Sequence, residues 1–183
     1  MVVVSRQVHI KAPVPRVFAL IADPLARARL NPEVSPIDVR VEGDGPMAVG
    51  SRIHFQLKSG DRMMDYRAEV REFVPERRIV TVAQTKIPFE VRLETSAENG
   101  GTRLTQTESF EPSEDMLQAE LTPVSRLAWL RYALALFGGD PLEQQRAEQE
   151  QLLAKRLGEK LESWLAAIKR ELERGDNTNP RDV

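Results

Sequence analysis

The chain has 183 residues, of which 41% are hydrophobic and 30% charged, with a net charge of −2 and no cysteine. This length and composition indicate one soluble domain with a sizeable core, and the near-neutral charge argues against binding to nucleic acid. The absence of cysteine excludes disulfides, thiol catalysis and cysteine-ligated metals, and it fits a reducing cytoplasm, where we expect the protein to reside.

The beginning of the chain predicts a strand followed by two short helices. Residues 2–11 alternate apolar and polar side chains, which is typical of a strand with one buried face. Apolar residues within 14–21 have helical spacing, a second short helix is expected over 25–30, and Asp23-Pro24 separates the two. The N-terminus has no basic region before a long apolar core, and the chain has no eighteen-residue apolar stretch. We therefore expect neither a secretory signal nor stable membrane insertion.

Six further strand patterns follow in regular succession. Short turns with glycine, proline or aspartate separate them, and Asn99-Gly100-Gly101 is a strong hairpin signal. This spacing predicts an antiparallel sheet with an apolar inner face and a charged outer face. The predicted strands cover residues 37–42, 51–59, 62–74, 77–85, 89–96 and 102–111.

Residues 140–174 predict a long helix that covers the inner face of this sheet. Asp140 is a suitable N-cap, Pro141 suits the first helical turn, and Gly175 suits the end of the helix. Such a helix would be about 50 Å long. Its apolar side chains recur every three or four residues and therefore share one face. They are Leu153, Leu157, Leu161, Trp164, Leu165, Ile168 and Leu172.

The most apolar segment of the chain, residues 121–137, lies between the last strand and the long helix. It contains Trp129, and its pattern over 124–137 predicts an extra helix that is apolar on more than one face. Three interpretations are open: a lid over a cavity, which we favour, a homodimer surface, or a contact with a membrane surface. The polar residues 176–183 are expected to form a disordered tail, which leaves residues 1–175 as a single domain.

Several short pieces of sequence give the chain a family resemblance. They are VHIKAP at 8–13 running into VFALIADP at 17–24, VGSR at 49–52, EFVPERRI at 72–79 and GTRLT at 101–105. In this order, and followed by a long closing helix, they resemble the START-related or Bet v 1-like superfamily (SRPBCC), also called the polyketide cyclase/dehydrase and lipid transport superfamily. The resemblance implies an α+β helix-grip fold, in which a curved antiparallel sheet of about seven strands wraps around the C-terminal helix and encloses a cavity. It also implies binding of a hydrophobic small molecule and, in some relatives, its chemical conversion.

The strand over 102–111 places polar side chains on the predicted inner face, because Gln106 and Glu108 alternate with apolar residues there. A carboxyl group in an apolar cavity would have a raised pKa, which makes Glu108 a candidate general acid or base. Tyr66 is a second candidate, since its phenol could bind a ligand carbonyl. The plainer interpretations place Glu108 at the cavity mouth beside water or in a pair with an arginine, and Tyr66 and Trp164 in the packed core. The residues expected to line the ligand site are Phe55, Met64, Tyr66, Phe89, Gln106, Glu108, Trp129 and Trp164.

Other common types of site are missing from the sequence. His9 and His54 are far apart in the chain and alternate with the apolar residues of their strands, so we expect them to be solvated. The sequence contains no glycine-rich phosphate loop or dinucleotide motif, and no serine lies in a nucleophile motif. We therefore expect no metal and no cofactor.

These observations lead to one favoured function and two alternatives. We expect a carrier or sensor of a lipid, an isoprenoid, a polyketide or a similar hydrophobic or amphipathic molecule, rather than an enzyme. The first alternative is a metal-free polyketide cyclase, aromatase or dehydratase that uses Glu108 or Tyr66 for proton transfer. The second is a protein-interaction module that docks through residues 121–137 and the long helix.

Overall fold

The computed structural model describes residues 1–114, 117 and 141–174, except for the side chains of 141–145. The elements appear in the predicted order, and their boundaries differ from the predicted ones by at most two residues. The segment 121–137, Asp140 and the tail 176–183 lie outside the described residues, as do the interpretations attached to them. The elements are β1 (Val2–Ile10), α1 (Val14–Ala22), α2 (Pro24–Arg29), β2 (Ser35–Val41), β3 (Arg52–Ser59), β4 (Arg62–Val74), β5 (Arg78–Gln84), β6 (Phe89–Glu98), β7 (Gly101–Phe110) and α5 (Pro141–Arg174).

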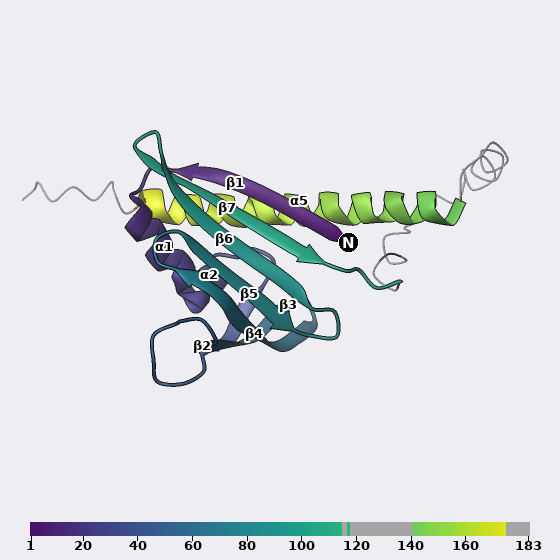
Figure 1. Ribbon diagram of the computed structural model, residues 1–183, viewed down its shortest axis with the longest axis horizontal. Coiled ribbons are helices and arrows are strands. Elements are labelled where there is room, and N and C mark those ends of the chain that lie inside the picture. Colours follow the sequence, from purple (N-terminus) through teal and green to yellow (C-terminus); the bar gives the residue numbers. More distant parts are fainter. Residues whose placement is uncertain (115–116, 118–140, 175–183) are drawn as a thin grey trace, which may run out of the picture.

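The strands form one antiparallel sheet in the order β1-β7-β6-β5-β4-β3-β2. The first strand therefore pairs with the last, and the strands between them form a meander back to β2. The sheet curves, α5 runs along β1 and β7, and α1 and α2 lie on the same side of the sheet (Figure 1). This arrangement confirms the predicted α+β helix-grip fold.

The β6–β7 hairpin turns through two residues with left-handed backbone. Asn99 has φ 47° and Gly100 has φ 73°. Two successive positive φ angles define the turn type that Asn-Gly sequences favour, because its twist matches that of the flanking strands. The predicted hairpin is confirmed, and it fixes the register from Glu98 opposite Gly101 up to Phe89 opposite Phe110.

A bulge in β4 changes which side chains face inwards. The strict alternation predicted for this strand holds up to Val70, which pairs with Thr81. The register then shifts, so that Glu72 pairs with Val80 and Phe73 turns towards the interior. The ring of Phe73 meets Phe18 of α1 edge-on, with 5.7 Å between the centroids. The extra residue thus lets one strand contribute to two parts of the core.

The predicted apolar face of α5 is buried against β1, β7 and α1. Leu161, Leu165 and Ile168 are almost fully inaccessible, whereas Trp164 is only half-buried. The first turns of α5 extend beyond the strands (Figure 1). At its other end, Lys169 Nζ donates to the backbone carbonyl of His9, at 2.6 Å. Burial of an apolar stripe along half of the helix, together with this polar contact, fixes α5 across the sheet.

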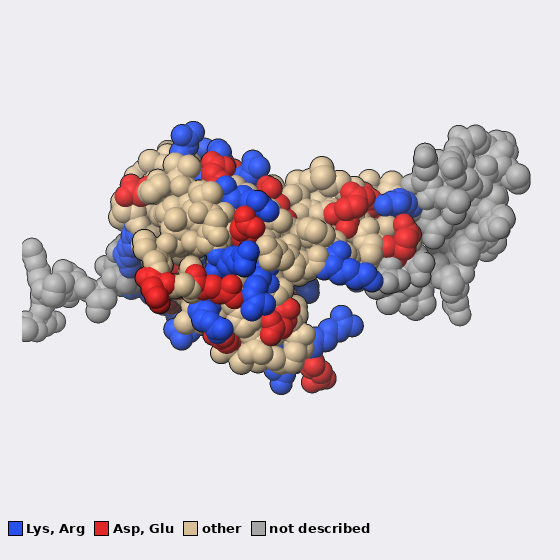
Figure 2. Space-filling view, turned by 60° about the horizontal axis from the view of Figure 1, so that its bottom comes forward, with Lys and Arg blue, Asp and Glu red and all other residues tan. Residues whose placement is uncertain are grey.

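The outer face of the sheet carries interspersed basic and acidic side chains (Figure 2). The expectation that both histidines are solvated is wrong for His54, which is only 9% exposed. Its ring nitrogens lie 3.3 Å from Asp38 Oδ2 on β2 and 2.9 Å from Asp65 Oδ1 on β4. His9 is half-buried and its Nε2 lies 2.9 Å from the carbonyl oxygen of Glu98. The alternation within one strand does not show which side chains of the neighbouring strands cover a polar residue and hydrogen-bond to it.

Candidate ligand-binding site

A cavity of about 210 Å³ lies between α2, the inner faces of β3 to β7 and the middle of α5. It adjoins the second of two apolar clusters, the one formed by α2 and strands β2 to β5. Small side chains make room for it: Ala28 on α2, Ala68 on β4 and Ala83 on β5 all line the wall. An apolar space of this size is large for a protein interior, where voids bigger than a water molecule are few.

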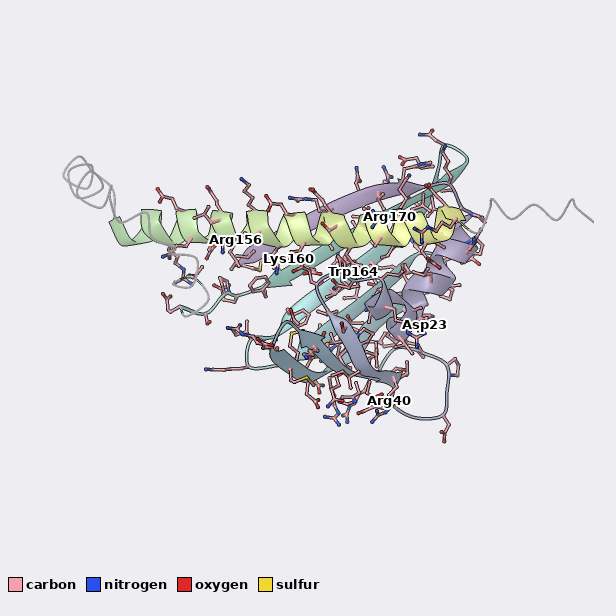
Figure 3. The ribbon with its side chains drawn as sticks, turned by 180° about the vertical axis from the view of Figure 1, so that it is seen from behind. Asp23, Arg40, Arg156, Lys160, Trp164 and Arg170 are labelled. Carbon is pink, nitrogen blue, oxygen red and sulfur yellow. The ribbon has the colours of Figure 1, made fainter. Side chains whose placement is uncertain are left out.

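Aromatic rings form much of the cavity wall. Phe55 and Tyr66 stack with 5.1 Å between centroids, and Tyr66 meets Phe89 edge-on at 5.8 Å. Trp164 lies on the opposite side, where it projects from α5 towards α2 and the sheet (Figure 3). These rings offer flat apolar surfaces to a bound molecule from two directions.

Arg27 brings a positive charge to this apolar wall. It belongs to α2, whose first turn is held by Asp23: the Asp23 carboxylate accepts from the backbone N–H groups of Leu25 and Ala26, at 2.9 and 3.0 Å. This capping orients the short helix so that Arg27 is buried, at 6% exposure. The Arg27 guanidinium carbon lies 5.9 Å from the centre of the Trp164 ring, and Trp164 Nε1 donates to the Arg27 carbonyl at 3.0 Å.

Glu108 and Tyr66 are the other ionisable groups of the cavity wall. Burial raises the pKa of Glu108, although a hydrogen bond from Gln106 and the charge of Arg27 oppose this effect. Burial also raises the pKa of Tyr66 to about 12, so its phenol keeps its proton at neutral pH. Burial lowers the pKa of Arg27, but a guanidinium remains charged at physiological pH. The site therefore contains one permanent cation, Arg27, and two groups, Tyr66 and Glu108, whose neutral forms are favoured by burial.

Gln106 lies beneath the cavity rather than in its wall. It is fully buried, and its Nε2 donates to Glu108 Oε1 at 2.8 Å. Within the described part of the chain, its own Oε1 accepts no hydrogen bond. Gln106 thus supports Glu108 from below, and the carboxyl group is held by a buried donor on its own strand.

The structure brings together most of the residues that the sequence suggested. The cavity wall includes Phe55, Met64, Tyr66, Phe89, Glu108 and Trp164. Gln106 lies behind this wall, and Trp129 is outside the described residues. Two further residues, Arg27 and Thr81, are buried in the wall and were not expected from the sequence. No sequence signal marks Arg27, because an arginine in a six-residue helix that also contains Arg29 has the pattern of a solvated face.

The raised pKa of Glu108 gives a testable prediction for stability. Burial favours the neutral carboxyl group of Glu108 in the folded protein. The stability that this group contributes is therefore fully present below its unfolded-state pKa of about 4.3, where it is protonated in both states. That stability is lost as the pH rises through the folded-state pKa. Glu108→Gln cannot ionise and keeps an oxygen that can accept from Gln106. We expect wild type and variant to be similarly stable at low pH, and the variant to be more stable above neutrality. Urea unfolding measured across this pH range tests this, and parallel stability profiles would contradict it.

The described residues contain neither a metal site nor a membrane span. No group of three or more histidine, aspartate and glutamate side chains within 1–114 and 146–174 is arranged to hold a metal ion. No helix in the described ranges is both long enough and apolar enough to cross a membrane.

Comparisons with known proteins agree with this fold. The model of the family described as polyketide cyclase/dehydrase and lipid transport matches residues 1–137. No curated protein matches the sequence. A START superfamily protein from Mycobacterium smegmatis has a similar structure, with a TM-score of 0.62, 16% identity, and coverage of 95% of this chain and 99% of that one.

Two further solved structures are similar over nearly the whole chain. Another Mycobacterium smegmatis protein has a TM-score of 0.59 at 14% identity, and the match covers 95% of this chain and 92% of that one. A polyketide-cyclase-like protein from Corynebacterium glutamicum has a TM-score of 0.54 at 18% identity, with coverage of 99% and 97%. At these identities the similarity shows a shared fold.

Proposed function

The chain belongs to the polyketide cyclase/dehydrase and lipid transport family, and on this premise we propose that it binds a small hydrophobic or amphipathic molecule in the cavity between α2, the sheet and α5. The observation that carries the proposal is the cavity itself: an apolar space lined by four aromatic rings, with a few polar groups that converge on it. This combination is typical of small-molecule sites, where apolar burial provides affinity and the polar groups fix orientation. The protein then acts as a carrier or sensor of that molecule, in the cytoplasm.

Tyr66 and Glu108 supply orientation in this proposal. Because its pKa is about 12, the Tyr66 phenol remains a hydrogen-bond donor to a ligand oxygen. A neutral Glu108 can also donate, and Gln106 holds its other oxygen in place. A homodimer through residues 121–137 remains an open alternative to the favoured lid.

We expect the protein to retain a ligand through gentle purification. Native mass spectrometry of the full chain should show an added mass, and organic extraction of the same sample should release a species of that mass. Apolar burial of roughly 25 cal/mol per Å² makes such retention favourable for a lipid-like molecule. A protein that purifies without added mass and also binds no hydrophobic probe would contradict the proposal.

A proton-transfer enzyme is the second candidate, and one observation favours it. Glu108 reaches the cavity with a raised pKa, which is the property needed of a general acid or base. Such an enzyme would cyclise or dehydrate a polyketide-like ligand. Glu108→Gln would then lose turnover and keep ligand binding, whereas unchanged turnover would remove Glu108 from the mechanism.

A further inference from the structure

Binding of a purely apolar molecule would not explain why the cavity contains Arg27. The residue is only 6% exposed, lines the cavity and has its guanidinium over the Trp164 ring. Among the described residues, no oxygen forms a hydrogen bond or ion pair with its guanidinium. Buried charges in proteins are normally paired, because removing a charge from water is costly unless an opposite charge or hydrogen-bond acceptors replace the water. The cavity therefore presents a fork of N–H donors that has no acceptor from the described part of the chain.

Glu108 is the acceptor that could have satisfied Arg27, but its carboxyl group is engaged elsewhere. Glu108 Oε1 accepts a hydrogen bond from Gln106 at 2.8 Å. The carboxyl group acts on Arg27 only electrostatically, at a distance too long for an ion pair. Burial also favours the neutral form of Glu108, which weakens it as a partner for a cation. The phenol of Tyr66 is uncharged at neutral pH for the same reason. The positive charge of Arg27 is thus left for a molecule that enters the cavity.

The size and lining of the cavity limit what that molecule can be. An apolar protein cavity of about 150 Å³ holds a benzene ring, and this one measures about 210 Å³. The rings of Phe55, Tyr66 and Phe89 on the sheet face Trp164 on α5 across this space. The space suits one aromatic ring, or an apolar body of similar bulk, with a small polar substituent.

We propose that the ligand is a small carboxylic acid with a compact, ring-sized apolar body, and that Arg27 binds its carboxylate through paired hydrogen bonds. A planar carboxylate matches the guanidinium fork, and a charge-assisted pair of this kind is stronger and more directional than a neutral one. The apolar body lies between the aromatic walls. This inference rests on the proposed function and specifies it: the cavity selects an anionic amphipathic molecule over a neutral one of the same shape.

Two matched probes and three variants of the full chain test this inference by isothermal titration calorimetry at pH 7. Benzoate carries the ring and the carboxylate, and benzyl alcohol has the same ring without a charge. Arg27→Met removes the charge and keeps an apolar stem, and Arg27→Lys keeps a charge without the fork. Arg29→Met is the matched control, because Arg29 is an exposed arginine of the same helix.

We expect wild type to bind benzoate at least about tenfold more tightly than benzyl alcohol, as one charge-assisted hydrogen bond predicts. Arg27→Met should lose this preference while it still binds benzyl alcohol to within a few fold of wild type, which also shows that its cavity is intact. Arg27→Lys should retain part of the preference, and Arg29→Met should behave as wild type.

Other results would overturn the inference in distinguishable ways. If wild type binds both probes equally, or if Arg27→Met keeps the preference for benzoate, the carboxylate site is wrong while the proposed cavity binding stands. If wild type binds neither probe, the proposed binding of small hydrophobic molecules in this cavity fails as well.

Discussion

Gly101→Ala is expected to destabilise the protein by about 4 kcal/mol or more, an effect at the upper end for single substitutions. Gly101 begins β7, and a Cβ atom there would lie 2.3 Å from the carbonyl oxygen of Ile10 on β1. Real side chains do not approach backbone so closely, so one of the two strands would have to move.

Neither strand is free to move at this point. Ile10 pairs with Thr102, the Thr102 hydroxyl donates to the Ala12 carbonyl at 2.7 Å, and the His9 ring contacts the Glu98 carbonyl. The contact between β1 and β7 joins the first strand of the chain to the last, and α5 packs against β1. A shift there would disturb the part of the core on which both the sheet and the long helix depend.

Gly100→Ala is the matched control for this prediction. Gly100 precedes Gly101 in the same turn, and a Cβ atom there would meet no atom within 4 Å. Its cost is limited to the left-handed backbone at φ 73°, about 1 kcal/mol. Thermal unfolding should show Gly101→Ala melting at least about 10 °C lower, or failing to fold, and Gly100→Ala melting only a few degrees lower. Similar melting temperatures for the two variants would contradict the steric explanation.

The fold was predictable from the sequence because its signals are local. Period-two alternation marks the strands, the Asn99-Gly100 turn sets one hairpin, and the three-and-four spacing from Leu153 to Leu172 marks the face of α5. Each of these patterns reports the environment of a residue along its own element. The bulge at Val70–Glu72 leaves no such pattern, and the inward position of Phe73 appears only in the structure.

The candidate site was predictable only where a side chain shares a face with apolar neighbours. Tyr66 and Glu108 follow that rule, and the structure places both in the cavity wall. Arg27 breaks it: a short capped helix buries an arginine against Trp164, which lies far away in the sequence. The burial of His54 between Asp38 and Asp65 has the same origin, because contacts across strands decide it. Residues whose environment comes from distant segments are therefore the ones that sequence patterns miss.

Ala83→Phe is expected to weaken ligand binding strongly while the protein remains folded. Ala83 is 2% exposed, lines the cavity on β5, and pairs with Ala68 on one side and Phe89 on the other. A phenyl ring at this position projects into the space that the apolar body of the ligand would occupy. Overpacking of a well-filled core costs about 1–3 kcal/mol, but here the added ring fills existing space, so the cost should be at the low end.

The expected loss of affinity follows from the apolar surface that the ligand can no longer bury. Full burial of a ring-sized apolar group is worth about 1.5–3 kcal/mol, which corresponds to roughly a 10- to 100-fold change in the dissociation constant. Benzyl alcohol and benzoate should both bind more weakly by this factor, and a co-purified species should disappear from native mass spectra. This joint loss differs from Arg27→Met, which should weaken binding of the anionic probe far more than binding of the neutral one.

Ala97→Phe provides the control with the same change in side chain. Ala97 lies on β6 and is exposed, so its phenyl ring would add apolar surface without entering the cavity. This variant should keep wild-type affinity for both probes, and circular dichroism should show that both phenylalanine variants are folded. If folded Ala83→Phe retained its affinity, the ligand would have to bind outside the cavity, because the phenyl ring and the apolar body of the ligand cannot occupy the same space.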